Sequence, residues 1–274
     1  MPDATERSWD LVSELPALLT TTIVWMCRLA ALAAAVNALE LLAACQALSD
    51  RGVWRAPFLS QQWGIWRRLL GPRAFTLVLM AQLALAAILA VAPGTSAGCV
   101  AAAALAFTSW LAALRFRGNV NGGSDAMLFT VLGGLAVAQL SNVAGVVHEG
   151  GVLYIAAQLT LSYVRAGIVK AREPSWWNGQ ALSAFLSLPA YGVPAWVPRR
   201  IPNDLPALRV ASLGVIGFEC LAPLAWFDPI ACLAVIAAAF TFHATTAALF
   251  GLNRFLLAWS AALPSLWYAV HRVS

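Results

Sequence analysis

The segment "YVRAGIVKAREPSWWNG", residues 163–179, contains Lys170, the only lysine in a chain that otherwise places its positive charge on arginines. An amine acts as a base only when it is neutral, and apolar surroundings disfavour the charged form. An arginine could not take this role, because it stays protonated in proteins. Lys170 ends an apolar run, so residue type and position suit an amine that can lose its proton. The alternative is an interfacial anchor whose charged end reaches toward water.

Other ionisable residues lie within apolar runs, where they are costly and usually face the interior of a helical bundle. His243 is a second candidate catalytic residue, and a packed, hydrogen-bonded histidine is the alternative. Arg28, Arg165 and Glu219 are candidate substrate-binding residues. An ion pair between helices is the alternative for Glu219, with Arg28 or Arg165 as its partner. Glu40 has the same two interpretations.

The connection "RFRGNVNGGSDAM", residues 115–127, is polar and rich in glycine. Asp125 can cap the helix that follows, but capping does not explain Asn119 and Asn121 beside two arginines. A polar pocket at the membrane surface would account for all three, so they are candidate substrate-binding residues. Trp176 and Trp177, which follow Lys170, belong to the same predicted site.

Composition places these residues in a membrane protein. Apolar residues make up 61% of the chain and charged residues 11%, whereas a soluble domain averages roughly 25% charged residues. A soluble alanine-rich bundle would need more surface charge. The net charge of +5 comes from arginines in short connections, where they would meet lipid phosphates. Membrane lipids are therefore the expected partners, and nucleic acid is not.

Eight apolar runs approach the roughly 20 residues that a membrane-spanning helix needs, and they lack the alternating pattern of a barrel. The sequence predicts an all-α, polytopic membrane helical bundle of about eight transmembrane helices, with residues 1–274 as one integral membrane domain. The runs cover residues 17–46, 75–92, 98–115, 126–146, 152–170, 207–226, 229–250 and 254–270.

Two long connections, residues 49–74 and 171–206, combine tryptophans with arginines or prolines, a composition typical of interfacial segments. We expect them to cover one end of the bundle, with a short amphipathic helix at "NGQALSAFLSL", residues 178–188. Because basic residues gather in these connections, the positive-inside rule places them in the cytoplasm and both termini outside. The expected location is the inner membrane of a bacterial cell.

The five cysteines lie in or at the ends of apolar runs and form no C-x-x-C pair, which indicates packing residues. A disulfide or a metal site is the alternative. Zinc-ligand spacing, a glycine-rich phosphate loop and a serine nucleophile motif are absent from the sequence. We therefore predict no metal.

Four segments resemble the HTTM membrane-domain family and the transmembrane part of vitamin K-dependent gamma-carboxylases. "YVRAGIVKAREPSWWNGQAL" resembles the family's Y-x-x-A-G-x-x-K segment followed by W-x-x-G. "RFRGNVNGGSDAMLF" resembles its polar loop, and "FTFHATTAALFGLNRFLLAWSAALP" resembles its F-H helix. "CRLAALAAAVNALEL" resembles its first span, with an early arginine.

The resemblance implies that Lys170 acts as base toward a reduced, vitamin K-like quinone, with molecular oxygen as co-substrate. The chain ends at Ser274, whereas the carboxylases continue into a large region that handles the peptide substrate. The polar loop also lacks that family's histidine. We therefore expect a carboxylase-like, quinol-dependent oxygenase that modifies a lipid or a small peptide. The alternative is a non-catalytic membrane factor for peptide-toxin production or maturation.

Overall fold

The computed structural model describes residues 4–49, 51–53, 70–115, 122–140, 145–188 and 204–273. The regular structure of these residues is entirely helical, which confirms the predicted all-α bundle. Asn119 and Asn121 lie outside the described residues. So do residues 54–69 and 189–203, which hold most of the first predicted interfacial segment and part of the second.

Each of the eight predicted runs contains helix. The described helices are α1 (Ala4–Ala43), α4 (Pro72–Val91), α5 (Ser96–Arg115), α6 (Gly122–Ala138), α7 (Gly145–Arg172), α8 (Pro174–Trp177), α9 (Gln180–Ser187), α10 (Leu205–Leu221), the 3₁₀ helix η3 (Ala222–Trp226), α11 (Pro229–Phe250), α12 (Asn253–Ala262) and α13 (Pro264–Val273).

In the described part of the chain, 6 helices are long and apolar enough to cross a membrane, so the protein is an integral membrane protein. They are α1 from Glu14 onward, α4, α5, α7, α10 with η3, and α11. The remaining two predicted spans differ from the expectation. Helix α6 is a shorter apolar helix, and the last run divides into α12 and α13. Pro264 begins α13, because proline cannot donate a hydrogen bond within a continuing helix but fits a first helical position.

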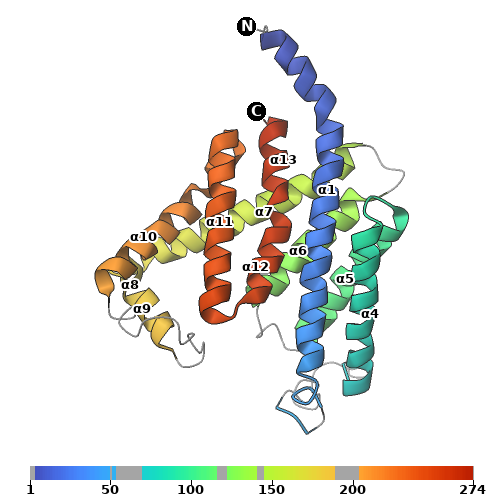
Figure 1. Ribbon diagram of the computed structural model, residues 1–274, viewed down its shortest axis with the longest axis vertical. Helices are drawn as coiled ribbons and strands as arrows, with labels where there is room; N and C mark the ends of the chain where they lie inside the picture. The colour runs from blue at the N-terminus through green and yellow to red at the C-terminus, as the bar shows by residue number, and fades with distance from the viewer. Residues whose placement is uncertain are drawn as a thin grey trace.

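The long helices pack into a bundle around α1, which contacts α4, α6, α12 and α13 (Figure 1). Helix α7 crosses behind α11 and α12 in this view and contacts α6, α10 and α13. Alanine and leucine supply most of the buried core, and such small side chains let helix axes approach closely in a membrane protein.

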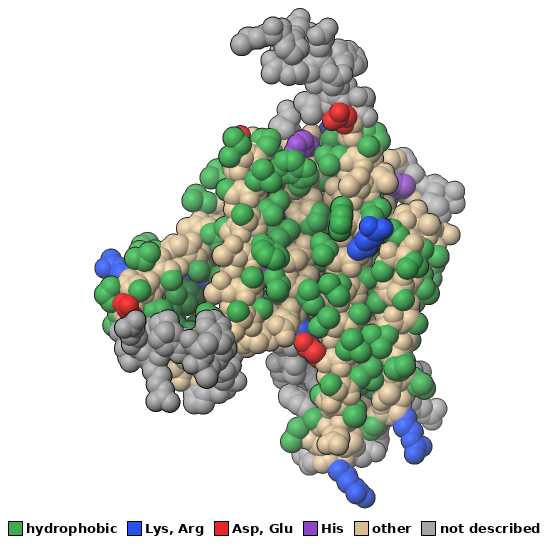
Figure 2. Space-filling view, in the orientation of Figure 1, with side chains coloured by type: hydrophobic (Ala, Val, Ile, Leu, Met, Phe, Trp, Pro, Cys, Tyr) green, Lys and Arg blue, Asp and Glu red, His purple; other side chains and the backbone are tan. Residues whose placement is uncertain are grey.

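The two ends of the bundle differ. Both termini lie toward the upper end in Figure 1, whereas the connection after α1, helices α8 and α9, and the turn at residues 251–252 lie toward the lower end. We call this lower end the basic end, because helix ends that carry described arginines lie there, namely those with Arg73, Arg115, Arg172 and Arg209. Hydrophobic side chains cover much of the face between the two ends (Figure 2).

Helices α8 and α9 form part of the predicted cover at the basic end, and the helix expected within residues 178–188 is confirmed as α9. The hydroxyl of Ser212 on α10 donates to the backbone oxygen of Trp176 at 2.6 Å. Between α8 and α9, Gly179 has a φ of +81°, and a Cβ there would lie 2.7 Å from the backbone nitrogen of Arg209. The cover is therefore fixed against α10 by a hydrogen bond and a close backbone approach.

We predict that Gly179→Ala destabilises the protein more than Gly94→Ala does. Gly94 also has a positive φ, of +75°, but a Cβ there would meet nothing within 4 Å. Gly94→Ala should therefore show only the backbone penalty, about 1–2 kcal/mol, while Gly179→Ala adds the clash with α10. Thermal unfolding in detergent measures both, and equal melting temperatures would contradict the close packing of this turn.

Candidate functional site

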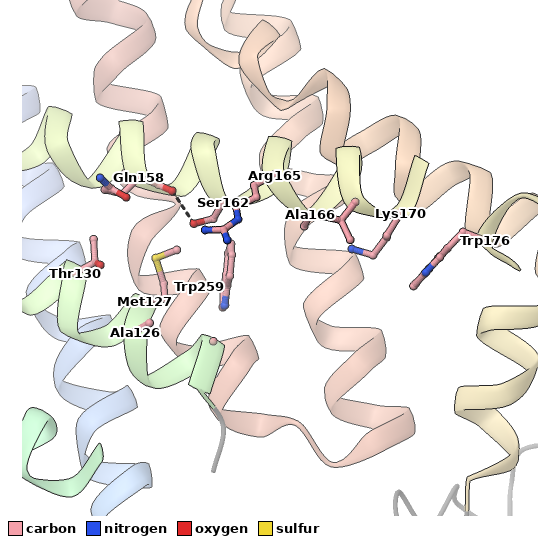
Figure 3. A pocket seen from close by; sticks show the side chains of 12 residues that line it. Ala126, Met127, Thr130, Gln158, Ser162, Arg165, Ala166, Lys170, Trp176 and Trp259 are labelled. Carbon is pink, nitrogen blue, oxygen red and sulfur yellow. Dashed lines mark hydrogen bonds between the residues drawn. The ribbon is translucent and has the colours of Figure 1, made fainter. Parts of the chain in front are cut away.

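A cleft of about 630 Å³ opens between α6, α7, α8 and α12 (Figure 3). One face of α7 supplies much of its wall, because residues three or four positions apart lie on the same side of a helix. Most of the wall is apolar, and a few polar groups interrupt it. The lining residues are Gly123, Ala126, Met127, Thr130, Gln158, Ser162, Arg165, Ala166, Val169, Lys170, Trp176 and Trp259.

Lys170 occupies one end of the cleft and forms an ion pair with Glu219 of α10. Its Nζ donates to both carboxylate oxygens, each at 2.7 Å. The Glu219 side chain is 3% exposed and that of Lys170 17%. Glu219 therefore does form an ion pair between helices, one of its two predicted interpretations, but its partner is Lys170 and not Arg28 or Arg165. Because the pair is largely removed from water, its members depend on each other for charge compensation.

Gly167 explains how α10 comes close enough to form this pair. A Cβ at Gly167 would lie 2.8 Å from the Sγ of Cys220 and 3.0 Å from the Cβ of Glu219. Only a residue without a side chain therefore lets α7 and α10 cross at this point. Lys170 follows one turn later on α7, within reach of the carboxylate. The spacing A-G-x-x-K thus has a physical basis, namely close helix approach followed by charge pairing.

The two tryptophans predicted for the site have different positions. The ring of Trp176 lines the cleft, and its centroid lies 5.2 Å from the Nζ of Lys170, a distance at which a cation and an aromatic face attract. Trp177 is 49% exposed and does not line the cleft. Its Nε1 instead donates to the backbone oxygen of Ala171 at 2.7 Å. Trp176 is therefore a wall of the site, and Trp177 ties α8 to the end of α7.

Arg165 also lines the cleft and points toward Ser162 and Trp259 (Figure 3). Among the described residues it has no ion-pair partner. The hydroxyl of Ser162 donates to the backbone oxygen of Gln158 at 2.8 Å. Since the charge of Lys170 is compensated by Glu219, the uncompensated positive charge on the cleft wall belongs to Arg165. This charge favours an anionic or electron-rich ligand group.

His243, predicted as catalytic, does not line the cleft. It is 3% exposed, and its Nε2 lies 3.1 Å from the hydroxyl of Tyr163. Its ring stacks on Trp259, with centroids 4.8 Å apart, and Tyr163 also packs on Trp259 at 4.9 Å. The three rings join α7, α11 and α12 behind the cleft. His243 thus supports the cleft floor, through Trp259, rather than facing a ligand directly.

Trp259 lines the site and Tyr163 supports it from the interior, although neither was a predicted site residue. Tyr163 begins the Y-x-x-A-G-x-x-K segment that ends at Lys170, and this spacing could have identified it. Trp259 lies in an apolar run that resembles any other membrane span, so no local signal marks it. Its position depends on how α12 packs against α6 and α7.

The remaining predicted site residues lie elsewhere. Arg28 is exposed on α1, with its guanidinium carbon 5.8 Å from the centroid of the Trp25 ring. Asp125 is half-buried in the first turn of α6 and does not line the cleft, although the neighbouring Gly123 does. Glu40 pairs with Arg254 at 2.6 Å, not with Arg28 or Arg165. The structure therefore brings together Lys170, Glu219, Arg165 and Trp176 from the predicted set.

Within the described residues, no group of three or more His, Cys, Asp or Glu side chains could hold a metal ion. Comparison of the chain with protein-family models, curated proteins and solved structures finds no match. The cleft itself therefore carries the functional interpretation. Its chemistry is that of a largely apolar chamber with a lysine–carboxylate pair at one end. On its wall is a guanidinium, that of Arg165, with no ion pair in the described part of the chain.

We predict that removing either member of the Lys170–Glu219 pair destabilises the bundle by about 3–5 kcal/mol, because a buried charge is left unpaired. The double variant Lys170→Met/Glu219→Leu should lose much less than the sum of the two single changes. Unfolding with dodecyl sulfate in mixed micelles measures each free energy.

The Glu149–Arg272 pair is the matched control, because its side chains are 28% and 48% exposed. Its double-mutant cycle should give a coupling of about 0–1 kcal/mol, as expected for exposed pairs. A coupling between Lys170 and Glu219 no larger than that would show that the buried pair does not hold α7 and α10 together.

Proposed function

We propose that the cleft binds a reduced quinone of the membrane, and that Lys170, paired with Glu219, accepts the proton of a quinol hydroxyl. The protein would then be a quinol-dependent, carboxylase-like oxygenase that modifies a lipid or a small peptide. One observation carries the proposal: the only lysine of the chain lies at the end of a largely apolar cleft with its Nζ 2.7 Å from a buried carboxylate.

The residues of the cleft suit such a ligand. Its volume falls in the range of about 300–1,000 Å³ typical of small-molecule sites. The apolar wall, which includes Met127, Trp176 and Trp259, suits an aromatic ring. The Trp259 ring lines the cleft and offers such a ligand an aromatic surface for packing.

Lys170 and Glu219 together could move a proton. The amine must first be neutral before it can accept one, and the carboxylate oxygens, at 2.7 Å from Nζ, are close enough to take its proton. Lys170 can then accept the proton of a hydroxyl group in the cleft, while Arg165 offsets the negative charge left on that oxygen. When bound, a reduced quinone supplies the electrons for oxygen chemistry.

We predict that the purified protein converts a reduced naphthoquinone to its epoxide in the presence of oxygen, as followed by mass spectrometry. Lys170→Ala and Lys170→Arg should both abolish the conversion, because arginine keeps the charge but cannot act as a base. Glu219→Gln should reduce it strongly. Arg172→Ala is the matched control, since Arg172 is exposed at the end of the same helix and does not line the cleft.

Two outcomes would contradict the proposal. The first is conversion by Lys170→Arg at the rate of the unaltered protein. The second is a bound peptide that co-purifies equally with the unaltered protein and with Lys170→Ala while neither converts the quinol. That second result would favour the alternative, a non-catalytic factor for peptide-toxin production or maturation.

We further propose that the basic end faces the cytoplasm of a bacterial inner membrane, because arginines gather there. An alkaline phosphatase fused after Val273 should then be active, and a green fluorescent protein fused at the same point should stay dark. Fusions within the connection between α4 and α5 should behave like those at Val273, because both lie at the opposite end of the bundle from the basic end (Figure 1). The reverse pattern would place the cleft on the outer side.

A further inference from the structure

A second cavity, of about 250 Å³, lies between α9, α10 and α11. Leu182 and Leu186 of α9 contribute to its wall, as do Leu208, Ala211 and Val215 of α10. None of its lining residues lines the cleft that contains Lys170. In Figure 2, the surface is hollowed between α10 and α11, with hydrophobic side chains around the hollow. The cavity is therefore a separate compartment on the other side of α10.

The cavity runs along the helices. Its residues on α10 extend from Leu208 to Val215, seven positions or about 10 Å at 1.5 Å per residue. Its residues on α11 extend from Phe242 to Phe250, or about 12 Å. Leu208 and Phe250 lie near the ends of their helices at the basic end, and Val215 and Phe242 lie deeper. The cavity thus begins near the basic end and extends inward, roughly as a lipid chain does.

Its chemistry excludes water and polar ligands. The described part of the wall is apolar apart from two threonines, and the hydroxyl of Thr246 donates to the backbone oxygen of His243 at 2.9 Å. A buried water needs two to four polar partners, and an apolar cavity of this kind stays dry. An empty cavity, however, forfeits packing contacts and destabilises the fold. A hydrocarbon chain would fill the cavity without needing polar partners. In a bilayer, lipid chains supply such a group.

An arginine next to a lining residue indicates which kind of lipid would bind. Arg209 follows Leu208 directly, is exposed, and has no ion pair among the described residues. The nearby Asp204 caps α10, accepting a hydrogen bond from the backbone nitrogen of Ala207 at 3.3 Å. An exposed arginine that is next in sequence to a lining residue, near the basic end of the cavity, suits a phosphate joined to an acyl chain.

We propose that this cavity binds one acyl chain of a membrane phospholipid, with Arg209 binding the phosphate. The bound chain fills the space against the face of α10 that carries Ala211 and Val215. The adjacent face, with Ser212, Ile216 and Glu219, is buried against the rest of the bundle. The lipid thereby supports the helix that presents Glu219 to Lys170. This goes beyond the quinol proposal and holds whether or not the cleft is catalytic.

The test uses vesicles of phosphatidylglycerol containing a phosphatidylglycerol with a photoreactive diazirine near the middle of one chain. After irradiation, peptide mass spectrometry should find labelling of residues 208–215 and 242–250 above that of the exposed helix face around Leu77 of α4, which is 70% exposed. Val215→Phe should reduce the labelling to the level of that reference face. Val210→Phe, on the same helix but 72% exposed and outside the cavity, should leave it unchanged.

Labelling no stronger than on the reference face, or undiminished by Val215→Phe, would overturn the proposal. Arg209→Gln should also lower the labelling, and a diazirine-bearing diacylglycerol, which lacks phosphate, should label the cavity less. Equal labelling by the two lipids would overturn the role of Arg209.

A second measurement does not depend on the bulk of phenylalanine. Ala211→Leu should raise the melting temperature of delipidated protein, because it fills part of the void. Added phosphatidylglycerol should raise the melting temperature of the unaltered protein but not that of Ala211→Leu. An equal rise in both proteins would contradict a lipid site in this cavity.

Discussion

The buried ion pair between Lys170 and Glu219 is the interaction on which the site depends. Two opposite charges in a low-dielectric interior are stable only if they stay together, and they stay together only because α7 and α10 touch at Gly167. The same crossing brings α8 onto α10 and places the Trp176 ring beside the amine. The pair, its aromatic wall and the cover at the basic end therefore form one unit.

Helix α7 separates two environments along its length. Tyr163 and Gly167, four residues apart, face the interior, where Tyr163 meets His243 and Trp259. Ser162, Arg165 and the other cleft-lining residues of α7 present polar and charged groups to the cleft instead. Helix α10 is likewise two-sided, with Glu219 toward α7 and an apolar cavity on another face. This arrangement lets a mainly hydrophobic protein hold charge at one defined place.

The sequence predicted the helices well, because long apolar runs leave the backbone few alternatives in a membrane. It also predicted Lys170, Arg165 and Trp176 as neighbours, since they share one helix and the turn after it. It did not predict the partner of Glu219, or that His243 lies outside the cleft. Such contacts depend on which helices pack against each other and on where they cross. Glu40 shows the same limit: its partner Arg254 is 214 positions away in the chain. The break at Pro264 divides a run that composition alone presents as continuous.

The most direct test is a high-resolution cryo-electron microscopy map of the protein in nanodiscs with a reduced naphthoquinone, recorded without oxygen. We predict ring-shaped density between α6, α7 and α12, with one oxygen at hydrogen-bond distance, about 2.7–3.2 Å, from the Lys170 Nζ, and with Glu219 still on the other side of that nitrogen. A map in which the Lys170 amine points into bulk solvent away from Glu219, or in which the ring lies elsewhere, would contradict the account.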